Sequence, residues 1–284
     1  MTRTIRQPGP PATERVTAVQ AGAIAIEASL PAGTRLLDAL AQLVAQHHAE
    51  SACLHLSGGA LFPFAYVIPG LSPDGSQAAF YSDTFRPPGH SVLEAGAVTV
   101  GWRDGKPFFH CHAIWTEADG KPGCGHVLPD DTIIAAPIQI HGSLIVGARF
   151  QVGPDPETGF SLFTPRPTGT PPPASATPAV ALRLAPNQDL IQTLESAAAS
   201  AGFTRAIVQG GVASTIEARF DNAPPLAGFA TELLVRRGTI DGTPHGASEL
   251  DIAIVDYLGN IATGRLTRGD NPVLMTFEGL LQAA

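Results

Sequence analysis

The sequence predicts two similar halves, each of which combines β-strands with one α-helix. A proline-rich segment from Thr164 to Pro178 cannot build a packed core and is typical of an extended connector. The order strand, helix, strand, glycine turn occurs on both sides of it, which indicates an internal duplication. With 284 residues and 44% hydrophobic content, the chain is long enough for two domains. We therefore expect a flexible N-terminus over residues 1–14, a first domain over 15–163, a linker over 164–178 and a second domain over 179–284.

The first half begins with an apolar, β-branched stretch from Val16 to Ala28, which predicts a strand. Leucines recur at helical spacing between Thr34 and Gln46, so this segment is expected to be a helix. A short apolar run from Ala52 to Leu56 then predicts a strand that enters the turn Ser57-Gly58-Gly59.

The second half repeats this order. The expected elements are a strand at Ala179–Leu184, a helix at Asn187–Ala201 and a strand at Arg205–Val208 that enters Gln209-Gly210-Gly211. We expect Asn187 to be the N-cap of the helix and Gly202 to be its C-terminal stop.

Three histidines are the strongest functional signal of the chain. Phe108 to Thr116 reads as a strand, on which His110 and His112 share one face because side chains alternate. His126 follows on the expected return strand, Gly123 to Leu128. With a three-residue loop Ala118-Asp119-Gly120, His126 lies opposite His112, whereas a two-residue Asp119-Gly120 loop would place it opposite Ala113 on the wrong face.

Three imidazoles with one open position form the ligand set of a catalytic zinc site rather than of a closed structural one. A single histidine in a half-buried strand is more often a hydrogen-bonded core residue, but three at this spacing favour the metal. Cys111 points to the other face and is expected to be a small buried hydrophobe. Cys124 shares a face with His126 and is expected to be a neighbour of the site rather than a ligand, because a fourth ligand would close it.

The second half lacks these histidines. When Gly120 is aligned with Gly259 and Gly125 with Gly264, the three histidines correspond to Glu249, Asp251 and Arg265. A cluster of carboxylates with a guanidinium is favoured there over a second catalytic centre. The first half would then perform the chemistry, and the second would support it.

Composition narrows the possible partners and location. The net charge is −8 and the only lysines are Lys106 and Lys121, which disfavours an extended contact with a nucleic-acid backbone. Three cysteines without a CxxC pair favour a reducing cytoplasm. The N-terminus has no apolar segment of signal-peptide length and no apolar run reaches membrane-spanning length, so we expect a cytoplasmic protein that does not enter a membrane.

Several motifs together resemble the PPC (plants-and-prokaryotes-conserved) domain. They are Ser57-Gly58-Gly59-Ala60-Leu61, Phe109-His110-Cys111-His112-Ala113, and Gly120 followed by Gly125-His126-Val127-Leu128. The resemblance spans residues 16 to 163, and a degenerate version covers 179 to 284. It implies an α+β fold in which each domain is a curved, mostly antiparallel sheet with a packed helix, and a homo-oligomer, typically a trimer. In plants this domain accompanies AT-hook segments, which are absent from this sequence. Their absence also disfavours DNA binding.

The same motifs are similar to those of acetolactate decarboxylase, which belongs to the same structural superfamily and binds zinc on an HxH pair and a later histidine. Only His110, His112 and His126 map onto those ligands, so the resemblance supports Zn²⁺ better than it supports the reaction. Cys124 also replaces the first glycine of the corresponding triplet.

A small anionic substrate would need a cation and proton-transfer groups. We expect Arg86, in a turn-rich loop before the histidine strand, to clamp a carboxylate, and note Arg103 at the adjacent Asp104-Gly105 turn. His90 is a candidate proton shuttle. Glu278, in an apolar C-terminal segment, is a candidate that could return a carboxylate to the site of the first half, although the pattern favours an exposed glutamate at the end of a strand.

Two functions therefore stay open. The first is a zinc-dependent lyase or decarboxylase, isomerase or hydrolase that acts on a small oxo- or hydroxycarboxylate. The second is a non-catalytic oligomeric module that binds a ligand, a protein or DNA, with a structural metal or none.

Overall fold

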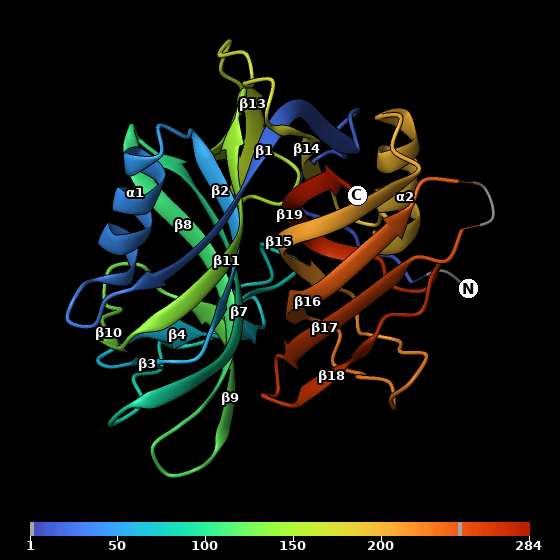
Figure 1. Ribbon diagram of the computed structural model, residues 1–284. Coiled ribbons are helices and arrows are strands. Elements are labelled where there is room, and N and C mark those ends of the chain that lie inside the picture. The colour runs from blue at the N-terminus through green and yellow to red at the C-terminus, as the bar shows by residue number, and fades with distance from the viewer. Residues whose placement is uncertain (1–2, 244–245) are drawn as a thin grey trace.

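The computed structural model describes residues 3–243 and 246–284, which form an antiparallel, sheet-rich molecule with one helix in each half (Figure 1). Helix α1 (Leu36–Gln46) follows strand β1 (Val16–Leu30). The remaining strands of the first half are β2 (Ser51–Ser57), β3 (Ala60–Leu61), β4 (Tyr66–Val67), β5 (Pro69–Gly70), β6 (Phe80–Tyr81), β7 (Ser91–Arg103), β8 (Lys106–Thr116), β9 (Pro122–Val127), β10 (Ile134–Ala136), β11 (Ile138–Val146), β12 (Ala148–Pro154) and β13 (Ser161–Pro167).

The second half has the same order of paired strands as the first. Its elements are β14 (Thr177–Leu184), α2 (Leu190–Ser200), β15 (Arg205–Thr215), β16 (Thr231–Asp241), β17 (Glu249–Asp256), β18 (Ile261–Arg265) and β19 (Val273–Ala283). The ladder β14–β19–β15–β16–β17–β18 corresponds strand by strand to β1–β11–β2–β7–β8–β9. Each helix follows the first strand of its ladder.

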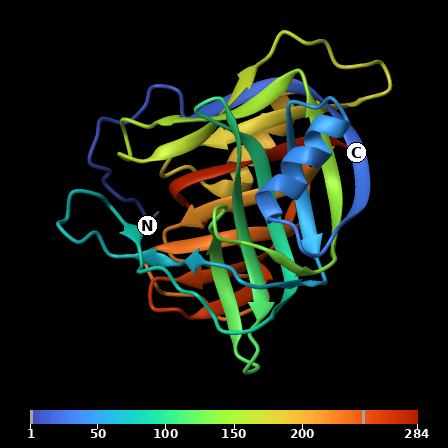
Figure 2. The ribbon, with the colours of Figure 1, turned by 90° about the vertical axis from the view of Figure 1, so that its left-hand side faces the viewer.

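The two halves share strand pairing instead of being separate bodies. The first part of β1 pairs with β14, and its second part pairs with β11, so one long strand belongs to both ladders. The two helices lie on the outer sides of the molecule, with the sheets between them (Figures 1 and 2). This arrangement covers the inner face of each sheet with the other half of the chain.

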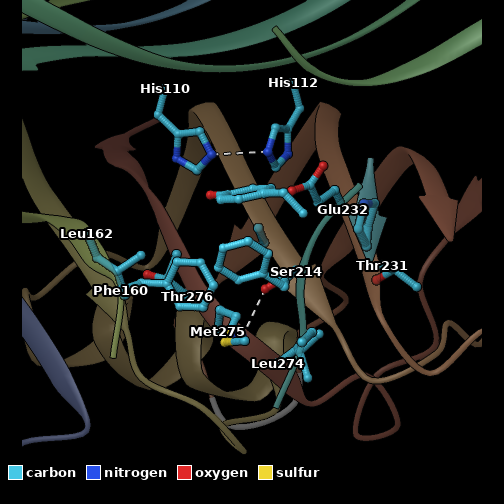
Figure 3. A pocket seen from close by; sticks show the side chains of 15 residues that line it. His110, His112, Phe160, Leu162, Ser214, Thr231, Glu232, Leu274, Met275 and Thr276 are labelled. Carbon is cyan, nitrogen blue, oxygen red and sulfur yellow. Dashed lines mark hydrogen bonds between the residues drawn. The ribbon is translucent and has the colours of Figure 1, made fainter. Parts of the chain in front are cut away.

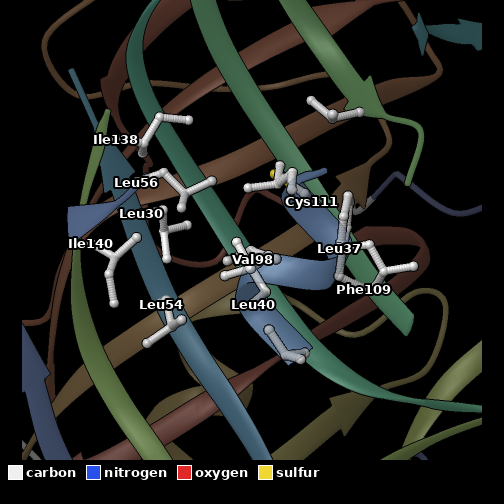
Figure 4. Packing of buried hydrophobic residues seen from close by; sticks show 14 of the residues in the cluster. Leu30, Leu37, Leu40, Leu54, Leu56, Val98, Phe109, Cys111, Ile138 and Ile140 are labelled. Atoms are coloured by element: carbon white, nitrogen blue, oxygen red, sulfur yellow. The ribbon is translucent and has the colours of Figure 1, made fainter. Parts of the chain in front are cut away.

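Alternation along β8 decides which residues meet the helix and which meet the other half. Phe109 and Cys111 are buried with leucines of α1, including Leu40, in the core of the first half (Figure 4). Ile114, on the opposite face, is buried against Val212 and Leu234 of the second half. Because His110 and His112 share the face of Ile114, they point toward the second half.

Helix α2 begins three residues later than expected, and Asp189 rather than Asn187 is its N-cap. The Asp189 side chain accepts a hydrogen bond from the backbone N–H of Gln192. Asn187 instead has a left-handed backbone (φ 64°), and its side chain exchanges hydrogen bonds with the backbone of Ile5. Gly202, with φ 80°, follows the end of α2 as expected.

Residues 3–14, for which we expect a flexible lead-in, form no helix or strand, but their side chains contact the rest of the molecule. Arg3 pairs with Glu217 and Asp270, and the buried Gln7 donates a hydrogen bond to the carbonyl of Leu274. These partners all belong to the second half, so the N-terminal segment crosses to it. Residues 1–2 lie outside the described residues.

The linker is shorter than expected, because β13 continues to Pro167 and β14 starts at Thr177. Pro165 and Pro167 are tolerated because β13, within the described part of the chain, has a ladder only with β12 and is therefore an edge strand. In the second half, β15 also continues past its glycines to Thr215. Gly210 and Gly211 have positive φ where the pairing of β15 with β19 shifts register, so they form a bulge rather than a terminal turn.

Candidate metal centre

Strands β8 and β9 form the hairpin that the histidine spacing predicts. His112 lies directly opposite His126 in the ladder. The backbone N–H of Glu117 donates to the carbonyl of Lys121, which leaves a three-residue loop, and Gly120 in this loop has φ 85°. The prediction of an odd-numbered loop with a left-handed glycine is confirmed.

The three imidazoles meet at one point. His110 Nε2 and His112 Nε2 are 3.0 Å apart (Figure 3), and the ring centroids of His110 and His126 are 4.8 Å apart. One nitrogen from each ring lies within 4.8 Å of the others. Within residues 3–243 and 246–284, this is the one group of three or more histidine, cysteine or acidic side chains close enough to share a metal ion.

The second half supplies the groups that orient two of these rings. Glu278 of β19 is fully buried, and its Oε1 lies 2.7 Å from His110 Nδ1. The carbonyl oxygen of Leu233 in β16 lies 2.8 Å from His112 Nδ1. Glu278 thus reaches the candidate site and is not an exposed glutamate at the end of a strand. The contact with Leu233 depends on how the two sheets pack.

These outer contacts fix the hydrogen positions on the rings. A carbonyl oxygen only accepts hydrogen bonds, so Nδ1 of His112 carries the hydrogen and Nε2 presents a lone pair. An ionised Glu278 imposes the same tautomer on His110. The two neutral rings then direct lone pairs at each other across 3.0 Å, an arrangement that a shared cation stabilises. The donor set therefore fits a metal ion.

Burial keeps two of the three rings neutral. Removal from water, reinforced by the neighbouring His110, holds the pKa of His112 well below its ordinary value, although the Leu233 carbonyl opposes this shift. The pKa of His126 is lowered by burial and by both other histidines. His126 Nδ1 is buried without a hydrogen-bond partner among the described residues. Neutral imidazole is the form that binds metals.

Glu232 is a carboxylate of the site that the sequence reasoning missed. It is 8% exposed, and its Oε2 has no hydrogen-bond partner among the described residues. Together with His110 and His112 it lines a small cavity of about 50 Å³, where it lies below His112 in Figure 3. Burial raises the pKa of Glu232 to about 8. An acidic residue at the start of the apolar run Leu233-Leu234-Val235 is the sequence signal that could have revealed it.

A second, larger cavity of about 660 Å³ also reaches the histidines. His110 and His126 line this cavity, and Arg103 contributes a guanidinium to its wall. Tyr81 and Phe80, from the separate β5–β6 hairpin, line both cavities. The histidines thus adjoin both a buried carboxylate and a larger cavity with an aromatic lining.

Two of the expected catalytic residues are not brought to the histidines. Arg86 is 60% exposed and pairs with Asp131 at 2.6 Å, and it lines neither cavity in the described part of the chain. The Arg86 guanidinium is therefore paired with a carboxylate beside the large cavity and does not face the histidines. His90 is exposed and packs against Phe62, with ring centroids 5.6 Å apart. Arg103 occupies the position at the cavity that Arg86 was expected to fill.

The two cysteines near the site lie in apolar surroundings. Cys111 is buried with the α1 face of the core, and Cys124 is buried with Ala97, Ile114 and Val212 between the halves. Neither belongs to the metal-binding group. Cys124 therefore does not close the site.

The corresponding hairpin of the second half carries charges in place of histidines. Asp251 lies opposite Arg265 in the ladder, and Arg265 also pairs with Glu249 at 2.6 Å. Arg265 Nε lies 3.4 Å from Asp251. The expected carboxylate–guanidinium cluster is present.

Comparison with known proteins gives matches among solved structures. No family model matches the chain, and no curated protein matches it. A plant- and prokaryote-conserved (PPC) protein from Pyrococcus horikoshii is 18% identical with a TM-score of 0.40, over 51% of this chain and 94% of that chain. A metal-containing protein from Archaeoglobus fulgidus is 18% identical with a TM-score of 0.40, over 50% and 94%.

A third similar structure is a proposed DNA-binding protein from Ralstonia eutropha, at 20% identity and a TM-score of 0.37, over 49% of this chain and 89% of that chain. The matched structures thus include a protein of the PPC family, which is the family that the sequence resembles. Within the described residues, neither helix has the length and apolar character needed to cross a bilayer.

Proposed function

We propose that the chain is a zinc-dependent enzyme whose three histidines hold the ion and whose substrate is a small oxo- or hydroxycarboxylate. The observation that supports this most directly is the orientation of the rings, since Glu278 and the Leu233 carbonyl direct the Nε2 lone pairs of His110 and His112 to one point. A set of three histidines leaves a position for substrate or water.

The reaction is a lyase or decarboxylase, isomerase or hydrolase reaction. Zinc supplies a Lewis acid that stabilises negative charge developing on an oxygen during any of these reactions. Glu232 supplies a carboxyl group in a cavity that it shares with His110 and His112, where Oε2 is free to take up or release a proton. Glu278 holds the His110 ring in place, so it is a positioning residue.

We propose that the two related halves have different roles, with the metal ligands in the first half and supporting residues in the second. We propose that both are PPC-like α+β domains that arose by duplication, since their ladders have the same strand order. The first half carries the histidines, and the second carries the Glu249–Arg265 ion pair at the corresponding hairpin. The second half also contributes Glu232, Leu233 and Glu278, so the site needs both halves.

We further propose that the chain is a cytoplasmic homo-oligomer that acts on a small molecule, with the trimer that the family resemblance implies. The net charge of −8 and the near absence of lysine disfavour DNA as a partner. Light scattering on the purified full chain measures the oligomer directly.

Elemental analysis of tag-free protein tests the proposed metal. We expect about one zinc per chain, and its loss in the double variant His110→Ala, His112→Ala, with circular dichroism unchanged. His90→Ala is the matched control, because His90 lies against Phe62 outside the site, and it should retain the metal. Absence of metal from both the wild type and His90→Ala would refute the zinc enzyme and leave the binding module.

A further inference from the structure

Arg103 is a cation at the large cavity without an acidic partner in the described part of the chain. It lies at the end of β7, and its Cζ is 5.1 Å from the centroid of the Phe108 ring. Most other arginines near the site are paired, as Arg86 is with Asp131 and Arg183 is with Asp155. When the flat face of a guanidinium stacks on an aromatic ring, its N–H groups point outward within the guanidinium plane. These donors therefore stay available for a ligand.

The position of Arg103 relative to the histidines follows from β8. Phe108, His110 and His112 share one face of this strand, and alternate residues are roughly 7 Å apart. Arg103 lies beyond the ring of Phe108, because it pairs with Lys106 at the end of the hairpin. A ligand on Arg103 that extends along β8 therefore passes over Phe108 and reaches His110.

The wall between these two ends is aromatic. Phe160 packs against Phe80 and Tyr81, with centroid distances of 5.9 and 5.7 Å. Phe108 packs against Phe163 at 6.0 Å. Tyr81 also lies 5.6 Å from His126, so the aromatic wall continues to the metal-binding group. All of these rings line the cavity of about 660 Å³, which suits an aryl-sized group.

The carboxylates at the rim do not cancel Arg103. Asp131 is paired with Arg86, and Asp130 lies near Arg35, whose pKa is raised mainly by Asp38 and to a small extent by Asp130. Both line the cavity after Leu128 and Pro129, on the segment that follows β9. Arg103 is thus the lining cation that can bind an incoming anion.

We propose that Arg103 binds the carboxylate of the substrate and that the aromatic wall binds an apolar, aryl-sized body, whose reacting end meets the histidines. This inference rests on the proposed function, because it names the substrate class of the same site. It also replaces Arg86 by Arg103 as the carboxylate clamp. The smallest oxo-acids would leave the aromatic wall unused.

Ligand-observed NMR titrations test the proposal with three probes: phenylacetate, acetate and the neutral analogue phenylacetamide. They are run on the protein as purified and after removal of metal by a chelator, so that a carboxylate bound to metal is not mistaken for one bound to Arg103. The variants are Arg103→Gln and the control Arg86→Gln, which removes an exposed arginine of the same cavity rim. Circular dichroism checks that both variants fold.

We expect phenylacetate to bind the wild type about tenfold more tightly than either acetate or phenylacetamide. Arg103→Gln should weaken phenylacetate binding about tenfold and leave phenylacetamide binding within about twofold. Arg86→Gln leaves Asp131 at the cavity without its partner, so it should weaken phenylacetate binding by no more than about threefold and leave phenylacetamide binding unchanged. These results should persist in metal-free protein.

The proposal is overturned if wild-type protein does not bind phenylacetate, if acetate binds equally well, or if Arg103→Gln and Arg86→Gln behave alike. Failure of the proposed function has a different signature. A protein that contains no zinc as purified but shows the Arg103-dependent preference would retain the carboxylate site and lose the zinc mechanism.

Discussion

His110 Nδ1 and Glu278 Oε1 lie 2.7 Å apart although 168 positions separate the two residues in the chain. Glu278 is fully buried in the middle of β19, where Arg183 of β14 and Val212 of β15 are its neighbours in the ladder. The strand that carries this carboxylate is therefore paired on both sides within the sheet of the second half. The carboxylate orients an imidazole of the first half, so metal binding should depend on a residue that is not a ligand.

Glu278→Gln should weaken zinc binding about 10- to 100-fold without removing a ligand. The glutamine has nearly the same shape, but it lacks the negative charge that favours the Nδ1–H tautomer and raises the basicity of Nε2. Competition of the purified protein with a chromophoric chelator measures the dissociation constant.

Glu249→Gln is the matched control for this variant. Glu249 occupies the position that corresponds to His110 in the second hairpin and pairs with Arg265 on a partly exposed surface. Its replacement should leave zinc affinity unchanged. Equal affinities of Glu278→Gln and the wild type would show that the buried carboxylate does not act on the ligand.

The local part of the site could be predicted from the sequence because it depends on strand alternation and one turn. The shared face of His110 and His112 follows from their spacing, and the register of His126 follows from the loop that ends at Gly120. Each of these relationships involves residues close together in the chain, so no knowledge of the tertiary packing is needed.

The remaining site residues depend on how the two sheets pack, which short-range patterns do not encode. Glu232 and the Leu233 carbonyl reach the histidines only because the inner faces of both sheets meet. In the sequence, Arg86 and Arg103 are similar candidates for the cation of the site, because both precede the histidine strand. The difference arises from the path of the loop, which brings Arg86 to Asp131 and leaves Arg103 over Phe108.

His55 should make the folded protein less stable in acid. It is buried between the halves, where Nε2 accepts a hydrogen bond from the backbone N–H of Gly210 at 3.2 Å. Burial, reinforced by the neighbouring His141, lowers the pKa of His55 from 6.5 to about 4, although a hydrogen bond to Val208 opposes the shift. Protonation would also remove the acceptor that Gly210 uses.

Because the unfolded chain binds this proton at a higher pH than the folded chain, the stabilising contribution is complete above about pH 6.5 and is lost as the pH falls toward 4. The full loss is about 3 kcal/mol. Denaturant unfolding at several pH values should show a shallower acid dependence for His55→Gln than for the wild type. His90→Gln, at an exposed position, should keep the wild-type dependence. An unchanged slope in His55→Gln would mean that His55 titrates alike in both states.

Asp189→Ala should destabilise the second half by about 2 kcal/mol, which is more than the loss of an ordinary helix cap. Asp189 accepts hydrogen bonds from the backbone of Gln192 in α2 and also from Gly269 and Asn271, just before β19. The substitution therefore leaves several backbone donors without a partner and loosens the connection between α2 and the strand that carries Glu278.

Arg35→Ala is the matched control, because Arg35 occupies the N-cap position of α1 but makes no capping hydrogen bond. It loses only an exposed ion pair with Asp38, so its effect should stay within about 0.5 kcal/mol. Denaturant unfolding of both variants at one pH gives the comparison. Equal losses of stability would show that the contacts of Asp189 contribute no more than a surface ion pair. A larger loss in Asp189→Ala, accompanied by weaker zinc binding, would show that the stability of the α2–β19 region supports the position of Glu278.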